Sequence, residues 1–284
     1  MQIGQPILLL TLVGVMLLMA QTPHATEVMS AAILAYGLPL IVQLRTLWVR
    51  LGAKTQTKSK LDIRLWISTA LPFVWSFAAT IVLVQAGTIL VGIWRSPTET
   101  AAYNAAASTS LFVAFFFQAV TASSAPQFAA LHAHGRHTDL SSLFTRIVRW
   151  TLLPSLTVTL ALVLFAAPIL RLFGSDFDQG RYVLALLALA QLSSVLAGPV
   201  AAVLGMTGHQ TILARVLSSA AIVYLLLGSV ATHFWGTTGA ALAFCGVTVA
   251  SNAYLMKAVS RNLGFNPLSW IRRLDLGPDS KTSQ

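Results

Sequence analysis

The sequence predicts an all-α protein, a polytopic membrane helical bundle with about eight transmembrane helices. Hydrophobic residues make up 56% of the chain and charged residues only 9%, against about 25% charged residues in soluble domains. Long apolar stretches follow one another, each at or near the roughly 17–25 residues that a helix needs to cross a bilayer core. They are Gly4–Ala20, Val28–Trp48, Leu65–Trp94, Ala101–Leu131, Ile147–Phe173, Tyr182–Gly205, Thr211–Thr232 and Thr238–Val259.

The positive charge is concentrated beside alternate gaps between these stretches. Of the 18 Lys and Arg residues, only Arg95, Arg171 and Arg181 lie on one side of the predicted bundle. The others lie on the opposite side, around the gaps after the second, fourth and sixth stretches and after the eighth. Because cytoplasmic loops retain Lys and Arg, that side is predicted to be the cytoplasm. We therefore expect a multi-pass membrane protein with both termini in the cytoplasm.

The net charge of +10 raises the question of nucleic acid, which we do not expect as a partner. The basic residues lie in short loops beside apolar spans rather than on one solvated face. They are better placed to meet the anionic headgroups of the lipid bilayer. The lone cysteine, Cys245, lies within an apolar run and is interpreted as a packing residue.

The first stretch is interpreted as a true span, because Met1–Pro6 lacks the basic segment that opens a signal peptide. A chain that begins inside a helix without a charged lead indicates an N-terminal truncation, a late start site or a fragment. Residues 49–64 form a basic polar segment without an apolar face. It is either an ordinary long loop or a cytoplasmic linker that separates two helical bundles.

The third and fourth stretches exceed the length that a bilayer requires, so we expect tilt, a bend or an extension. About 20 residues at 1.5 Å each lead from Leu65 to Gln85, which makes 85–87 a candidate break. The fourth stretch is rich in alanine and is expected to pack centrally in its bundle. Pro126 is expected to bend this stretch or to set the direction of its exit.

The polar groups within the stretches are amides and hydroxyls, and no Asp, Glu, Lys or Arg lies deep within a span. Because an unpaired amide in hydrocarbon is costly, these groups face other helices or a watery cavity. They either form interhelical hydrogen bonds or line a path for a polar substrate. The candidates for such a path are Gln85, Asn104, Gln118, Gln127 and Gln191. Asn104 and Gln118 are close to four helical turns apart and are expected to share one face, whereas Gln127 faces elsewhere.

Three arginines, Arg45, Arg64 and Arg149, lie at the cytoplasmic ends of spans. Guanidinium groups bind phosphate through two hydrogen bonds, so these residues suit the diphosphate of a lipid-linked sugar. The alternative is that they extend to the lipid headgroups and set the topology.

No catalytic constellation, cofactor motif or metal site is expected, and the protein is not predicted to be an enzyme. His132, His134 and His137 form a short cluster, but no acidic or cysteine partner accompanies them. No glycine-rich phosphate loop or Ser/His/Asp pattern occurs.

The order of several motifs resembles the multidrug/oligosaccharidyl-lipid/polysaccharide flippase (MATE-like) superfamily, most of all its polysaccharide (O-antigen type) branch. The 94–106 segment resembles the entry to the second helix of each lobe, and 124–135 resembles the exit of that helix. The Phe-Gly turn in 169–177, Gly198-Pro199 and 204–208 resemble the region around the tenth helix. Each motif is degenerate, and the resemblance, which covers Leu61–Phe265, rests on their order and spacing.

The resemblance implies twelve to fourteen spans in two lobes that rock about a central cavity. Residues 1–48 would be the last two helices of the first lobe, 49–64 the basic linker, 65–261 the six-helix second lobe and 262–284 a cytoplasmic tail. The family's first four helices would then be missing from this chain.

The leading functional hypothesis is a flippase that moves an undecaprenyl-diphosphate-linked oligosaccharide across the bacterial inner (cytoplasmic) membrane. Its product would serve the synthesis of surface polysaccharide, such as the O-antigen of lipopolysaccharide. Its expected partners are that lipid-linked oligosaccharide and the glycan polymerase or glycosyltransferase machinery. The alternatives are a multidrug or cation exporter of the same fold, a membrane glycan ligase or acyltransferase, and a non-transporting fragment. The exporter is disfavoured because that branch tends to use intramembrane acidic residues, and the enzyme because the outer loops are short.

Overall fold

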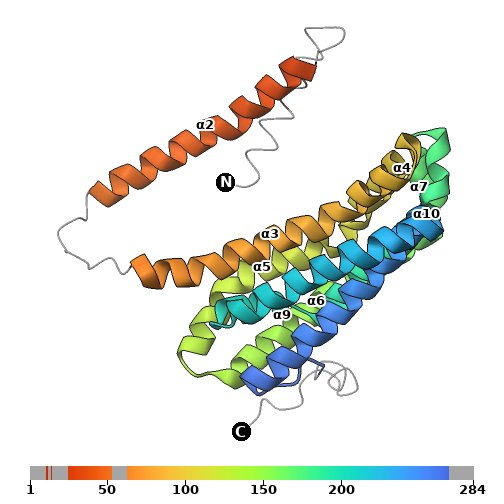
Figure 1. The fold of residues 1–284 in the computed structure, drawn as a ribbon. Coiled ribbons are helices and arrows are strands. Elements are labelled where there is room, and N and C mark those ends of the chain that lie inside the picture. Colours follow the sequence, from red (N-terminus) through yellow and green to blue (C-terminus); the bar gives the residue numbers. More distant parts are fainter. Residues whose placement is uncertain (1–10, 12–13, 15–24, 53–62, 269–284) are drawn as a thin grey trace. The chain divides into compact units, whose positions relative to one another are not determined.

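The structure, a computed structural model, describes residues 25–52 and 63–268 together with Thr11 and Gly14 (Figure 1). Most of the predicted first span, the centre of the predicted linker and the end of the predicted tail lie outside the described residues.

The chain divides into two compact units, Met1–Asp62 and Ile63–Gln284. In the first unit, helix α2 spans Ala25–Gly52, has Pro39 inside it and contains the predicted second stretch. Its 28 residues correspond to about 42 Å of helix.

The described residues of the second unit form helices joined by short turns and contain no strand, which confirms the all-α fold class. Four of its helices, α3, α6, α8 and α10, are long and apolar enough to span a membrane, and the bent pair α4–α5 makes up to five. The number of about eight spans for the whole chain stays a prediction. The elements of this unit are α3 (Ile63–Trp94), α4 (Pro97–Ser110), α5 (Phe112–Ala133), α6 (His137–Leu164), α7 (Ala166–Arg171), η1 (Ser175–Gly180), α8 (Arg181–Ala197), α9 (Val200–Met206) and α10 (Gln210–Leu263).

Helix α10 folds back on itself, so it supplies two limbs that lie side by side (Figure 1). Gly236 has φ 63° and ψ −148°, a conformation that is essentially restricted to glycine. The Tyr224 hydroxyl lies 3.4 Å from the Ala240 carbonyl oxygen, 16 residues further along the chain. A straight helix would separate two such residues by about 24 Å. The two limbs correspond to the seventh and eighth predicted stretches.

The turn between the limbs is fastened by the end of α3. Arg95 Nη2 donates hydrogen bonds to the carbonyl oxygens of Thr232 at 3.2 Å and His233 at 3.1 Å. Directly after Arg95, α4 begins with a capping box in which Ser96 and Glu99 satisfy each other's backbone N–H groups. This junction therefore holds α3, α4 and the α10 turn together.

Helix α3 is continuous, so the expected break at 85–87 is wrong. Glycine at position 87 serves close packing there instead, because a Cβ would collide with the hydroxyls of Tyr103 and Tyr224. The fourth stretch is the one that breaks: α4 ends at Ser110, and α5 runs on from it at an angle of 43°. Pro126 lies inside α5, which continues to Ala133.

Three apolar clusters hold the second unit together. One joins α5, α6, α8 and α9 to the ends of α10 around Phe128, Phe144 and Leu204. A second packs α4, α7 and α8 against α3, α5, α6 and the second limb of α10. The third joins α3 to both limbs of α10 around Tyr224. Large apolar side chains such as Trp150, which is 77% exposed, cover the outer faces, as expected of helices that face lipid.

Candidate functional site

Three of the predicted path residues line one polar cavity in the second unit. Gln85 comes from α3, Asn104 from α4 and Gln191 from α8, and the second limb of α10 closes the cavity with Phe244. The cavity has a volume of about 70 Å³. Its remaining lining residues are Val84, Thr88, Tyr103, Ala107, Ser108, Ser110, Leu111 and Leu187. The packing of four helices thus gathers amides that lie up to 106 positions apart in the sequence.

The three amides are available to a ligand. Gln85 and Asn104 are exposed and Gln191 is half-buried. Within the described residues, none of the three makes a hydrogen bond to a protein group. An amide offers both donors and acceptors, so this group of side chains suits a ligand rich in hydroxyls. The cavity carries no charged side chain among its lining residues.

A buried tyrosine pair lies beside the cavity. The hydroxyls of Tyr103 and Tyr224 are 3.3 Å apart, and the side chains are 3% and 0% exposed. Either hydroxyl can donate in the pair, and the Tyr224 hydroxyl also lies within donating distance of the Ala240 carbonyl oxygen. Phe244 packs edge-on against the Tyr224 ring at 5.4 Å. The pair therefore ties α4, which carries Asn104, to the α10 hairpin.

Replacing Tyr103 with phenylalanine is expected to lower the free energy of unfolding by about 1 kcal/mol, because the hydroxyl of buried Tyr224 loses a partner. Unfolding of the purified protein by SDS in mixed micelles measures this change. The matched control is Tyr254→Phe, at an exposed tyrosine on the second limb of α10. An equal loss of stability in both variants would contradict the role of the pair.

The other predicted path residues lie elsewhere. Gln118 and Gln127 are exposed on α5, and Arg149 is exposed on α6. None of them lines the cavity. The expectation that Asn104 and Gln118 share one helical face stays a prediction, and a bend of 43° lies between the two residues. Arg45 is exposed on α2, in the first unit. Arg64 lies in the first turn of α3, with its side chain outside the described residues.

Sequence reasoning did not select Tyr103, Tyr224, Thr88 or Ser108 as residues of the site. Tyr103 lies beside Asn104 in the 94–106 motif, and that position was an available signal. Tyr224 is surrounded by apolar residues in the sequence, and its contact with Tyr103 spans 121 positions. No local pattern predicts that contact.

Within the described residues, no group of three His, Cys, Asp or Glu side chains is placed to hold a metal ion. In the histidine cluster, the rings of His132 and His137 meet edge-on with centroids 6.0 Å apart. His134 Nδ1 lies 2.7 Å from the Ala130 carbonyl oxygen, at the end of α5. The cluster thus belongs to the turn between α5 and α6.

Comparison with known proteins extends these observations. The MatE family matches residues 72–254. The probable low-salt glycan biosynthesis flippase Agl15 of Haloferax volcanii is 24% identical over 189 residues, which are 64% of this chain and 39% of that protein. The chain therefore spans well under half the length of this curated relative.

Two crystal structures of the Vibrio cholerae MATE transporter VcmN have a similar fold at 17% sequence identity. One, of a point mutant of that transporter, matches with a TM-score of 0.71, over 92% of this chain and 62% of that one. The other, the bent form, matches with a TM-score of 0.69, over 94% and 62%. With the family match across most of the second unit, these findings show that the chain belongs to the MatE family and is a multi-pass membrane protein with the helical fold of MATE transporters.

Proposed function

We propose that this chain is part of a flippase that moves a lipid-linked oligosaccharide, of the undecaprenyl-diphosphate type, across the bacterial inner membrane. In this proposal both termini are cytoplasmic, and the product serves surface polysaccharide synthesis such as that of O-antigen. The relative Agl15, a probable glycan biosynthesis flippase, supports this branch of the family. The observation that carries the proposal is the uncharged polar cavity of Gln85, Asn104 and Gln191.

The chemistry of the cavity fits a glycan. Sugar hydroxyls donate and accept hydrogen bonds, as do the amides of Gln85, Asn104 and Gln191 and the hydroxyls of Thr88 and Ser108. A site built from such groups holds a neutral polar ligand without the desolvation cost of a buried charge. A cation exporter calls for an acidic group at the corresponding position.

The size of the cavity indicates that it is only one wall of the path. Its volume of about 70 Å³ is well below the roughly 300–1,000 Å³ of a pocket that encloses a small ligand. Gln85 and Asn104 are exposed, so we propose that the path is completed by residues outside Ile63–Leu268. In this arrangement, the exposed guanidinium of Arg149 on α6 meets the diphosphate at the cytoplasmic entrance.

Deleting the gene from its host is expected to abolish surface polysaccharide and to leave the lipid-linked oligosaccharide on the cytoplasmic face of the membrane. Mass spectrometry of lipid extracts measures its amount, and a membrane-impermeant oxidant added to spheroplasts reports its side. Normal surface polysaccharide in the deletion strain would refute the proposal. Increased drug sensitivity with normal polysaccharide would favour the exporter instead.

Complementation with the variant Q85L/N104L/Q191L tests the cavity itself. We expect surface polysaccharide synthesis to fall at least ten-fold, because each lost hydrogen bond to the sugar weakens binding by roughly five-fold. The matched control is Gln210→Leu, which removes an amide that is half-buried like Gln191 but lies outside the cavity. Equal amounts of both variants in the membrane exclude a folding defect. Full activity of the triple variant would show that the substrate takes another route.

A further inference from the structure

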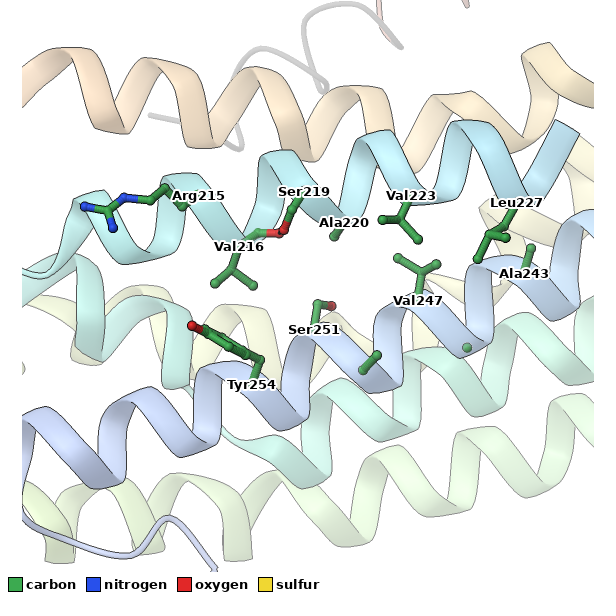
Figure 2. A pocket seen from close by; sticks show the side chains of 12 residues that line it. Arg215, Val216, Ser219, Ala220, Val223, Leu227, Ala243, Val247, Ser251 and Tyr254 are labelled. Carbon is green, nitrogen blue, oxygen red and sulfur yellow. The ribbon is translucent and has the colours of Figure 1, made fainter.

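A long groove runs between the two limbs of α10, separate from the polar cavity. One part has a volume of about 630 Å³ and lies between Val223 and Leu227 on the first limb and Ala243 and Val247 on the second (Figure 2). A second part, of about 460 Å³, continues it toward the start of the first limb and the end of the second. Both parts share Arg215, Val216 and Tyr254 as lining residues. The two parts therefore form one continuous groove.

The second part of the groove is strongly basic. Arg215 comes from the first limb, and Lys257 and Arg261 come from the second. Lys257 and Arg261 are four residues apart and thus lie on the same face of their limb. All three side chains are exposed. The ion pairs among the described residues, Arg136–Asp139 and Arg171–Asp178, involve none of these three cations.

The first part of the groove is an apolar trough. Val223 and Leu227 are 42% and 56% exposed along it. The opposite wall is hollow because it carries small residues, Ala243, Gly246 and Ala250. At Gly246 a Cβ would meet no other atom within 4 Å. Tyr254, which is 59% exposed, marks the boundary between trough and basic end, the position that amphipathic aromatic rings take at a membrane interface.

The length of the trough matches one leaflet of a membrane. Arg215 and Leu227 are twelve positions apart on one helical limb, which corresponds to about 18 Å. Half of a bilayer's hydrocarbon core is about 15 Å thick. A molecule whose charged head lies at the basic end would therefore lay about one leaflet's length of hydrocarbon along the limbs. A phospholipid acyl chain has this length, whereas an isoprenoid carrier extends beyond it.

We infer that this groove is a binding site for an anionic phospholipid of the leaflet on the basic side of the bundle. The phosphate is held by Arg215, Lys257 and Arg261, and one acyl chain lies in the trough between the limbs of α10. None of the three cations forms an ion pair with an acidic side chain among the described residues. The negative headgroup of the phospholipid supplies that missing negative charge. This inference does not depend on the proposed transport function.

The test uses the full chain, purified in detergent and stripped of lipid, with bound lipids counted by native mass spectrometry during titration. Phosphatidylglycerol is expected to bind at least ten-fold more tightly than phosphatidylcholine with the same acyl chains. Inorganic phosphate is expected not to displace it, because free phosphate gains nothing from the trough. Equal affinity for the two phospholipids, or displacement by millimolar phosphate, overturns the inference.

Two variants separate the basic end from the trough. R215Q/K257Q/R261Q is expected to weaken phosphatidylglycerol binding about 100-fold, at roughly five-fold for each cation near the lipid surface. It is expected to weaken phosphatidylcholine, whose headgroup has no net charge, much less, so that the preference for phosphatidylglycerol is lost. Its control is Arg146→Gln, an exposed arginine on α6 outside the groove.

Gly246→Leu fills the trough and is expected to weaken the binding of both phospholipids at least five-fold. Its control is Ala253→Leu, at an exposed position on the same limb outside the groove.

Unchanged phosphatidylglycerol binding in R215Q/K257Q/R261Q overturns the site even when Gly246→Leu behaves as expected. Undecaprenyl diphosphate added at equal concentration is expected to leave phosphatidylglycerol bound. Its displacement of phosphatidylglycerol would identify the occupant as the isoprenoid carrier and overturn the phospholipid assignment. The lipid-binding measurements do not depend on surface polysaccharide synthesis. The phospholipid site can therefore be refuted without refuting the flippase proposal, and the reverse also holds.

Discussion

Replacing Gly239 with valine is expected to prevent the two limbs of α10 from closing. A Cβ at position 239 would overlap the carbonyl group of Ala231, with the carbonyl carbon at 2.6 Å, and would lie 3.0 Å from Cβ of Trp235. Backbone atoms cannot rotate away as a side chain does, so the limbs must separate. We expect a loss of at least about 3 kcal/mol in the free energy of unfolding, at the upper end of overpacking costs. SDS unfolding in mixed micelles measures it.

Gly246→Ala on the same limb is the matched control for this prediction. A Cβ at position 246 would meet nothing within 4 Å, and alanine is favoured over glycine in a helix by about 1 kcal/mol. This variant should therefore be as stable as the original protein or more so. If Gly239→Val and Gly246→Ala have the same stability, the close approach of the limbs is wrong.

Replacing Gly87 with alanine is expected to disturb both the packing and the polar cavity. The new Cβ would collide with the Tyr103 hydroxyl and would lie 2.7 Å from the Tyr224 hydroxyl. Both rings are buried within apolar clusters, so neither can swing aside without leaving a void. We expect the free energy of unfolding to fall by about 2 kcal/mol, as measured by SDS unfolding.

A double-mutant cycle makes the Gly87 prediction specific. In the Gly87→Ala background, Tyr103→Phe removes the oxygen nearest to the new methyl group but leaves the ring Cε1 at 2.8 Å and the Tyr224 hydroxyl at 2.7 Å. It is therefore expected to lower stability less than it does in the original protein. The coupling between the two changes should be up to about 1 kcal/mol. Gly92→Ala on the same helix is the control, because its Cβ would make an ordinary contact with Thr100 at 3.6 Å. If the effects of Gly87→Ala and Tyr103→Phe on stability are additive, the close contact between position 87 and the Tyr103 hydroxyl is contradicted.

The helical class is predictable from the sequence because hydropathy over a span is a sum over many residues. Where the helices break is a different matter. Gly87 is a candidate break by its residue type, but it lies inside a continuous helix because two tyrosines occupy the space of its side chain. The true bend follows Ser110, where neither glycine nor proline stands nearby in the sequence. A break of this kind depends on what packs around the helix.

The sequence predicts that amide side chains line the candidate cavity, but it does not predict which of the amides do so. Intramembrane amides must face protein or water, which selects Gln85, Asn104 and Gln191 but equally Gln118 and Gln127. Which amides meet depends on how α3, α4 and α8 are rotated about their axes. That rotation is set by packing between the helices and cannot be read from the sequence of any one of them. The basic residues show the same limit. The sequence assigns Arg215 and Lys257 to topology alone, whereas the structure also brings them to one groove.

The bend after Ser110 also gives the cavity a source of polarity that no side-chain substitution can remove. Where a helical ladder is interrupted, carbonyl groups in its last turn lose their usual amide partners. The Ser110 hydroxyl donates to one of them, the Ala107 oxygen, at 2.7 Å. Residues 107, 108, 110 and 111 all line the cavity, so this interrupted turn forms part of its wall. Leucine at all three amide positions would therefore make the lining of the cavity less polar, but the lining would not become entirely apolar.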